Sequence, residues 1–195
     1  MNVIVVTQDY PPYSMSQVAL NVKKLVRALS GRGHNVYVVC VNSVETRVGI
    51  DNIEVIAVAP SIKSHINYLS YAWSLTTDLT RGISEAVHRL RGLPALVCAY
   101  EWVSGLAAFP LKTALGVKLF FFIHSTEHER GGVGTLLGDT IAFLERLIVE
   151  KADYVIAYSK DSLEILTQKY RAPREKTLLA RDMDNLITRI ERRDS

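Results

Sequence analysis

The sequence predicts an α/β fold, a single Rossmann-like doubly wound domain with a mainly parallel sheet and helices on both faces. Three observations carry this prediction. Short continuous apolar runs are typical of strands buried on both faces, apolar stripes at helical spacing are typical of covering helices, and the two alternate through nearly the whole chain. The 195 residues, 48% of them apolar, suffice for one core and would be crowded as two domains.

The strands are expected where short runs of valine, isoleucine, leucine and aromatic residues occur. These runs span residues 2–7, 36–41, 53–59, 95–99, 117–123 and 153–158. The stretch NSVETRVGIDN between the second and third runs is polar, so it is expected to be a connection rather than a strand.

Helices are expected between these runs, because apolar residues there recur at spacings of three and four. The first stripe ends at two glycines and consists of Val18, Val22, Leu25 and Leu29. Further helices are expected at residues 67–90, at 103–116 with a kink at Pro110, around 137–148, and after Ser159, which suits a helix cap. Residues 183–195 are expected to form a closing helix and a charged tail, set apart from a domain at 1–182, with the arginines Arg189, Arg192 and Arg193.

The aromatic residues Tyr68, Tyr71 and Trp73 begin the longest stripe. They suit either core packing or a platform for a ligand or a membrane surface, and the sequence favours core packing.

Composition and cysteine usage narrow the class of protein. Lysine and arginine outnumber the acids by 23 to 20, and the net charge of +3 does not indicate a nucleic-acid partner. Cys40 and Cys98 fall inside strand-like runs, which favours buried free thiols in a reducing compartment. The first apolar run is too short for a signal peptide, and no run suits a membrane span. We therefore expect a cytoplasmic protein with at most peripheral membrane association.

The stretch LFFFIHSTEHERGG, residues 119–132, is the main candidate site. A buried strand leads directly into charged and imidazole side chains and then into two glycines. Such groups are costly to desolvate, so their concentration at the carboxyl end of a parallel strand indicates a ligand site.

The pattern HSTEH within this stretch matches the H-x-x-E-H signature of zinc peptidases. That chemistry needs a helix that carries both histidines on one face, whereas here a strand runs into a loop. A metal site is therefore not predicted. The other chemistry is sugar transfer, in which polar loops at a sheet edge bind a hydroxyl-rich or phosphorylated ligand.

Several motifs in order point to one family. TQDYPP, LSGRGHNVYVVCV, the YEW stretch, IHSTEHERGG and EKADYVIAYSKDSLEILTQKY together resemble the N-terminal domain of family 4 retaining glycosyltransferases, which have the GT-B fold and are related to glycogen synthases. The resemblance covers residues 2–185. It implies a nucleotide-sugar co-substrate, UDP-, ADP- or GDP-linked, with no tightly bound cofactor, and a sugar or glycan acceptor.

The resemblance also implies roles for individual residues. It makes His124 and Glu127 the candidate catalytic residues. His124 would bond the transferred sugar and support an oxocarbenium-like transition state, and Glu127 belongs to the polar loop where acceptor and donor meet. The positions that correspond to the acceptor or substrate side of the cleft are Tyr10, Glu101, Trp102, Arg130, Gly131, Gly132 and Ser159.

Four departures from the family pattern stand out. Residues 13–17 read YSMSQ where the family carries two adjacent glycines that approach the donor phosphates. Cys98 and Tyr100 replace histidines before the acidic residue and tryptophan, and ARDMDN replaces an Asn-Gly turn after the strand expected at 176–179. The donor-binding second Rossmann-like domain of a GT-B enzyme has no counterpart after Asp182.

Three functions stay open at this point. The chain is the acceptor-side half of a retaining glycosyltransferase that works with a separate donor domain, or a non-catalytic carbohydrate-binding or regulatory module derived from such an enzyme, or a hydrolase or metal enzyme built on HSTEH. The first is favoured because the histidine, the glutamate and the double glycine are all present.

Overall fold

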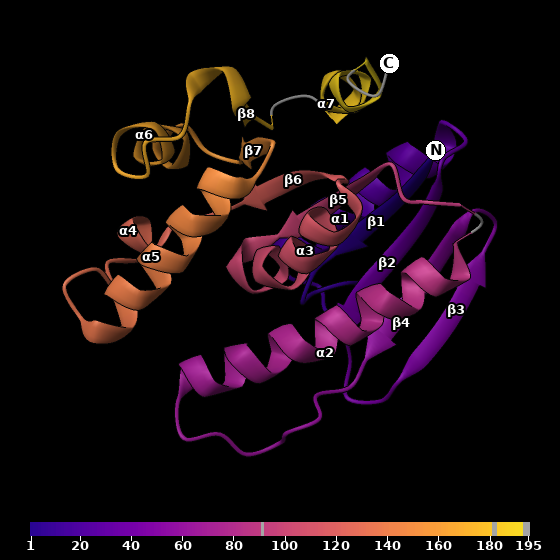
Figure 1. Ribbon diagram of the computed structural model, residues 1–195, viewed down its shortest axis with the longest axis horizontal. Helices are drawn as coiled ribbons and strands as arrows, with labels where there is room; N and C mark the ends of the chain where they lie inside the picture. The colour runs from indigo at the N-terminus through magenta and orange to yellow at the C-terminus, as the bar shows by residue number, and fades with distance from the viewer. Residues whose placement is uncertain (91, 181–182, 193–195) are drawn as a thin grey trace.

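The computed structural model describes residues 1–90, 92–180 and 183–192 and has an eight-stranded sheet between two layers of helices (Figure 1). The strand order is β3-β4-β2-β1-β5-β6-β7-β8, and every neighbouring pair is parallel except β3 and β4. The strands are β1 (Asn2–Val6), β2 (Asn35–Val41), β3 (Thr46–Ile50), β4 (Ile53–Val58), β5 (Leu96–Tyr100), β6 (Lys118–Ile123), β7 (Tyr154–Ala157) and β8 (Thr177–Leu179). The predicted α/β class with a mainly parallel sheet is confirmed.

The helices cover both faces of the sheet, as predicted. They are α1 (Gln17–Gly31), α2 (Tyr68–Arg89), α3 (Glu101–Leu115), α4 (Glu127–Arg130), α5 (Leu136–Lys151), α6 (Lys160–Gln168) and α7 (Met183–Arg192), with a 3₁₀ turn at Arg174–Lys176. One core packs α2, α3 and α5 against the sheet, and α1 and α7 pack against the other face. Because both faces are covered, the central strands are apolar on both sides.

One expectation for the connection between β2 and β4 was wrong. Residues 46–50 form the edge strand β3, which pairs antiparallel with β4 through Val48 opposite Val55. Every residue of this short edge strand is exposed or half-exposed, so it lacks the buried apolar run by which the other strands are recognised. Arg47 holds this strand to helix α2, since its Nε donates to Glu85 Oε1 at 2.6 Å and a second nitrogen bonds the other oxygen.

A second correction concerns the segment after His124, which the sequence predicts as loop. The chain instead forms the one-turn helix α4, begun by a capping box in which Thr126 Oγ1 accepts from Glu129 N at 3.3 Å and Glu129 Oε2 accepts from Thr126 N at 2.6 Å. Four residues are too few for a recognisable apolar stripe, although T-x-x-E is the signature of such a cap.

Helix α3 also begins earlier than predicted, at Glu101, and continues through Pro110 as one element. Its first residue takes a positive φ of 63°, so the chain turns sharply from β5 straight into the helix. Glu101 and Trp102 therefore belong to a helix rather than to a loop.

The aromatic residues at the start of α2 correct another expectation. Tyr71 packs against the core, but Trp73 is 63% exposed and Tyr68 is 46% exposed, so core packing fails for two of the three. The remaining stripe residues of the helix, Ala72, Leu75, Leu79, Ile83 and Ala86, are buried. Trp73 lies off that stripe, which its spacing already indicates.

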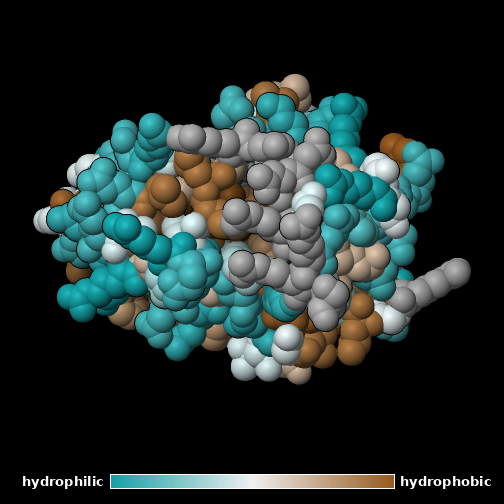
Figure 2. All heavy atoms as spheres, turned by 90° about the horizontal axis from the view of Figure 1, so that it is seen from above, coloured by the Kyte–Doolittle hydropathy of each residue, from teal (hydrophilic) through white to brown (hydrophobic). Residues whose placement is uncertain are grey.

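Helix α7 lies against α1, with Leu186, Ile187 and Ile190 buried in the core of that face. Arg32 on the turn after α1 pairs with Glu191 at 2.9 Å. Figure 2, which looks down on α6 and α7, shows a mostly hydrophilic surface with scattered apolar patches. The side chains of Arg189 and Arg192, and all of Arg193, lie outside the described residues.

The strand order reverses direction between β1 and β5, since β2 and β4 follow on one side and β6, β7 and β8 on the other. In doubly wound sheets ligands bind in the crevice at this switch point, outside the carboxyl ends of the strands. Helix α1 follows β1, α3 follows β5, and His124 follows β6. No helix among the described residues is long and apolar enough to cross a membrane.

Candidate functional site

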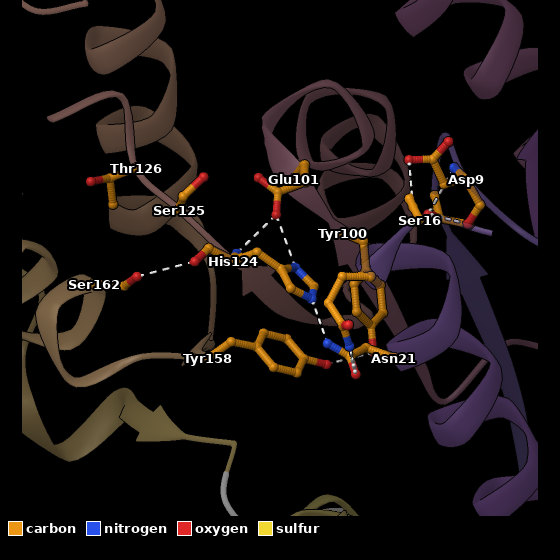
Figure 3. A network of polar contacts seen from close by, with 12 residues as sticks. Asp9, Ser16, Asn21, Tyr100, Glu101, His124, Ser125, Thr126, Tyr158 and Ser162 are labelled. Atoms are coloured by element: carbon orange, nitrogen blue, oxygen red, sulfur yellow. Dashed lines mark hydrogen bonds and ion pairs between the residues drawn. The ribbon is translucent and has the colours of Figure 1, made fainter. Parts of the chain in front are cut away.

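His124 sits at the centre of a polar network at the carboxyl edge of the sheet (Figure 3). Its imidazole Nδ1 lies 3.1 Å from Glu101 Oε1, and its Nε2 lies 2.8 Å from Asn21 Nδ2. The backbone N–H of His124 donates to the same Glu101 oxygen at 2.8 Å. Residues that follow three different strands, β1, β5 and β6, thus meet at one ring.

These contacts fit one tautomer of the neutral ring. Glu101 accepts a hydrogen bond from Nδ1–H, whereas the Asn21 amide donates a hydrogen bond to the lone pair of Nε2. Gln17 Nε2 donates to Asn21 Oδ1 at 3.3 Å, which fits the same orientation of the Asn21 amide. The ring is therefore oriented by two neighbours before any ligand arrives.

Two aromatic rings support the imidazole. Tyr158, at the carboxyl end of β7, stacks on His124 with ring centroids 3.9 Å apart and planes within 10°. Tyr158 donates its hydroxyl proton to the Tyr100 hydroxyl at 3.4 Å. Burial raises the pKa of Tyr158 to about 12 and raises that of Tyr100 as well, so both phenols stay neutral near pH 7.

Glu101 holds His124 from the first turn of α3, and its backbone lies in the left-handed region. A non-glycine residue at positive φ costs free energy and persists where the surroundings fix it, and such positions are concentrated at functional sites. The two bonds that Glu101 accepts from His124 provide that fixation.

The loop after β1 is closed by its own side chains. Ser16 caps α1 by accepting from Ala19 N at 3.1 Å, and it donates its hydroxyl proton to Asp9 Oδ2 at 3.1 Å. Ser14 Oγ accepts from Ser16 N at 3.3 Å. No residue in 13–17 has a positive φ. Serine side chains therefore occupy the backbone donors that adjacent glycines would leave open to a phosphate.

Glu127 and Arg130 belong to a second, buried network that leads away from His124. Arg130 Nε donates to Glu127 Oε2 at 2.8 Å, and another guanidinium nitrogen bonds Glu145 Oε1. Glu145 on α5 also accepts from Glu127 N at 2.9 Å and from the Tyr170 hydroxyl at 2.5 Å. Burial raises the pKa of the Glu145 carboxyl, and these partners oppose the rise. The structure does not bring the Glu127 carboxylate to His124.

Gly131 and Gly132 serve the geometry of this network. Gly131 ends α4 at φ 75°, the left-handed conformation that glycine adopts without cost. A Cβ on Gly132 would lie 1.8 Å from Glu127 Oε1, so the backbone passes directly against that carboxylate.

Ser159 and its neighbour Ser162 bind the far side of the His124 segment. Ser159 caps α6 by accepting from Ser162 N at 2.8 Å. Ser162 Oγ donates to the His124 carbonyl oxygen at 3.2 Å, and it also lies 2.8 Å from Glu129 Oε1. Ser159 is thus next to the site through a shared cap rather than through His124 itself.

Trp102 and Tyr10 are buried rather than open to the site. Trp102 is 4% exposed and packs in the core between the sheet and helix α2. Tyr10 is 8% exposed and lines a different cavity, of about 620 Å³, along with residues of α1, β3 and β4. Burial also raises the pKa of the Tyr10 hydroxyl.

Sequence reasoning missed Asn21, Tyr158 and Ser162. Asn21 carried a signal, because it interrupts the buried stripe between Val18 and Val22 of α1 and a buried polar side chain there needs a partner. Tyr158 and Ser162 gave no comparable signal, since their roles depend on the pairing of β6 with β7.

The two histidines of HSTEH have different surroundings. His124 stacks on Tyr158, whereas His128 on α4 lies against Tyr170 with ring centroids 5.4 Å apart. In the part of the chain that the structure describes, no group of three or more histidine, cysteine, aspartate or glutamate residues is placed to hold a metal ion.

Comparisons with known proteins agree with this architecture. Residues 18–181 match the family model of the glycosyl transferase 4-like domain. The chain is 25% identical over 180 residues to an uncharacterized glycosyltransferase of Methanocaldococcus jannaschii, a match that covers 90% of this chain and 44% of that protein.

Solved structures give the same picture of the fold. Sucrose-phosphate synthase from Thermosynechococcus elongatus matches with a TM-score of 0.74 at 16% identity, over 91% of this chain and 47% of that one. The catalytic domain of starch synthase IV from Arabidopsis thaliana, bound to ADP and acarbose, matches with a TM-score of 0.61 at 12% identity, over 91% and 50%. The chain thus spans about half the length of each of these three proteins.

Proposed function

Because the chain belongs to the glycosyl transferase 4-like domain family and has the fold of an N-terminal GT-B domain, we propose that it is the acceptor-side half of a retaining glycosyltransferase. A separate polypeptide would supply the donor-binding domain and bring a UDP-, ADP- or GDP-linked sugar to the carboxyl edge of the sheet. The observation that carries the proposal is the pre-oriented His124 ring at the switch point.

In the proposed reaction the bond between the sugar C1 and the diphosphate oxygen breaks, and a bond forms between C1 and an acceptor hydroxyl oxygen. The nucleoside diphosphate leaves with the bonding electron pair, and the hydroxyl proton passes to the leaving phosphate. His124 bonds a hydroxyl of the transferred sugar through Nε2, for which the Asn21 amide moves aside. Preorganised groups of this kind stabilise the charge that develops in the transition state.

Glu127 receives a supporting role in this proposal. Its carboxylate is paired with Arg130 and packed against Gly132, so it shapes the loop after His124 rather than contacting the reacting atoms. Glu101 holds the imidazole in the required tautomer, as the partners of active-site histidines commonly do.

Copurification tests the proposal. The chain is isolated from its native cells, co-eluting proteins are identified by mass spectrometry, and the complex is assayed for nucleoside diphosphate release from UDP-, ADP- and GDP-sugars. We expect a partner with a nucleotide-binding Rossmann-like domain, and release that falls at least about a hundredfold in His124→Ala. His88→Ala is the matched control, because His88 is exposed on α2. Equal activity in the two variants would reject the role of His124.

A carbohydrate-binding or regulatory module is the second candidate, and the serine-rich loop at 13–17 favours it. This candidate predicts that a free sugar raises the unfolding temperature of the chain alone, with no partner or nucleotide, and that His124→Ala removes the rise. A thermal shift screen of hexoses and oligosaccharides separates the two functions.

A further inference from the structure

A wide groove opens between the amino-terminal half of α2 and helix α5, with the start of α3 as its floor. Its volume is about 830 Å³, within the range of small-molecule sites. The apolar residues that line it are Ile62, Leu69, Trp73, Trp102, Phe143 and Leu144. In Figure 1 the labelled helices α2 and α5 flank α3 on the side of the sheet opposite α1.

The lining leaves a large apolar area in water. Trp73 is 63% exposed and Phe143 is 54% exposed. Ile62, also in the lining, is 52% exposed. Contiguous exposed apolar surface on this scale is uncommon unless it binds something.

Most of the polar side chains that line the groove are engaged within the protein. Ser61 donates to Asp78 through both its hydroxyl and its backbone N–H, the latter at 2.9 Å. The hydroxyls of Thr77 and Thr140 donate hydrogen bonds to carbonyl oxygens of their own helices, at 3.4 and 2.7 Å. A sugar or an extended peptide would need hydrogen bonds that these groups already make, whereas a hydrocarbon chain needs none.

The first turn of α3 links the groove to the His124 site. Trp102 lines it and directly follows Glu101, which holds His124. Tyr68 packs edge-on against Trp102 with ring centroids 6.2 Å apart. Burial raises the pKa of the Tyr68 hydroxyl, the Arg130 charge opposes the rise, and Glu101 and Glu127 add to it, so this hydroxyl lies within electrostatic reach of the site.

Positive charge lies at the Phe143 side of the groove. Phe143 also lines a smaller hollow of about 190 Å³ with His128, Arg146 and Lys169, while Asp139 contributes one negative charge. Arg146 stacks over the Phe143 ring, 5.8 Å from its centroid. An apolar groove beside such a rim fits an amphiphile whose hydrocarbon chain carries an anionic group.

From these observations we propose that the groove seats the hydrocarbon chain of a lipid-linked acceptor, whose phosphate meets the rim of Arg146 and Lys169. This inference rests on the proposed transferase function, since it names the class of acceptor. It commits to a single chain in the groove rather than to a membrane surface or a protein partner.

The two tryptophans of the chain, Trp73 and Trp102, both line the groove, so their fluorescence reports on its occupancy. The purified chain is titrated with bromodecyl phosphate and with bromodecanol below their micelle concentrations, because bromine quenches a nearby indole. We expect saturable quenching by both, with tighter binding of the phosphate. Phe143→Asp should weaken binding about tenfold or more, because the bound hydrocarbon would remove the new carboxylate from water.

Phe109→Asp is the matched control, since Phe109 is an exposed aromatic on α3 outside the groove, and it should bind as the wild type does. His124→Ala should also bind both brominated ligands as the wild type does. Failure of the sugar-transfer proposal is therefore distinguishable from failure of this one. Quenching that does not saturate, or that weakens equally in both aspartate variants, would overturn the inference. So would quenching that requires phosphatidylcholine or phosphatidylglycerol vesicles, which would assign the surface to membrane contact.

Discussion

Asn21 on helix α1 and His124 at the end of strand β6 meet at 2.8 Å, although 103 residues separate them in the sequence. The contact spans the crevice at the switch point of the sheet. It brings the first helix of the fold to the ring that the sequence marks as the candidate site.

The tautomer of His124 is the first testable consequence. With the ring neutral, its proton should reside on Nδ1, because Glu101 Oε1 accepts there and Asn21 donates to Nε2. A two-bond nitrogen–proton correlation spectrum at alkaline pH reports the protonated nitrogen. Glu101→Gln should shift part of the population to the Nε2 tautomer, whereas Glu150→Gln, on the exposed face of α5, should leave the spectrum unchanged. A wild-type ring protonated on Nε2 would contradict this assignment.

Gly132→Ala should destabilise the protein. The new Cβ would meet Glu127 Oε1 at 1.8 Å, so the carboxylate must move and its pair with Arg130 must loosen. We expect a loss of about 1–3 kcal/mol in the free energy of unfolding, measured by urea titration. Gly49→Ala tests the same change where nothing lies within 4 Å, and its effect should be small.

The bond between Arg47 and Glu85 should make part of the stability depend on pH. Hydrogen bonds from Arg47 lower the pKa of the Glu85 carboxyl below its ordinary value. A lowered folded-state pKa adds stability above the unfolded value, about 4.3, and that stability is lost as the pH falls through the folded value. Arg47→Met should therefore lower the unfolding temperature at pH 7, and its gap from the wild type should narrow below about pH 4.

Arg81→Met provides the comparison for that experiment, because Arg81 pairs with Glu45, just before β3, and both side chains are more exposed than Arg47 and Glu85. Its effect at pH 7 should be within about 0.5 kcal/mol. A gap for Arg47→Met that stays constant as the pH falls from 4 to 2 would show that the lost stability is packing rather than charge.

The cysteines should resist thiol reagents in the folded protein. Cys40 and Cys98 are buried free thiols, and burial raises the pKa of Cys40 to about 12 and that of Cys98 further. Since the thiolate is the reactive form, Ellman's reagent at pH 8 should label neither residue, and both should react after unfolding in guanidinium chloride. Rapid labelling without denaturant would contradict the buried placement of these strands.

The sequence predicts the central part of the fold well. Runs such as VYVVCV and ALVCA are apolar on both faces, which leaves little alternative to buried parallel strands. Edge strand β3 was not predicted, because an exposed strand does not need apolar residues. Helix α4 was not predicted, because a single turn is too short to show an apolar stripe at helical spacing.

The candidate site was predictable only in part. His124 stands out in the sequence, because desolvating an imidazole at the end of a buried strand costs free energy. In the structure it lies at the switch point of the sheet. The side chains that hold it, Asn21, Glu101 and Tyr158, come from three other segments, and only the strand order brings them together. Trp73 shows the reverse case, because its aromatic character suggests the core while its position off the stripe places it at the surface.

Met1 and helix α7 both contact His34, and this contact indicates where a tag can be attached. The amino group of Met1 lies 3.3 Å from His34 Nδ1, and Glu191 Oε1 lies 2.8 Å from the other nitrogen of the same ring. His34 precedes β2, so this corner lies at the amino edge of the sheet, across the molecule from His124. An affinity tag or fluorophore attached at this corner would leave the carboxyl edge unobstructed, so the protein can be immobilised with its crevice facing the solution.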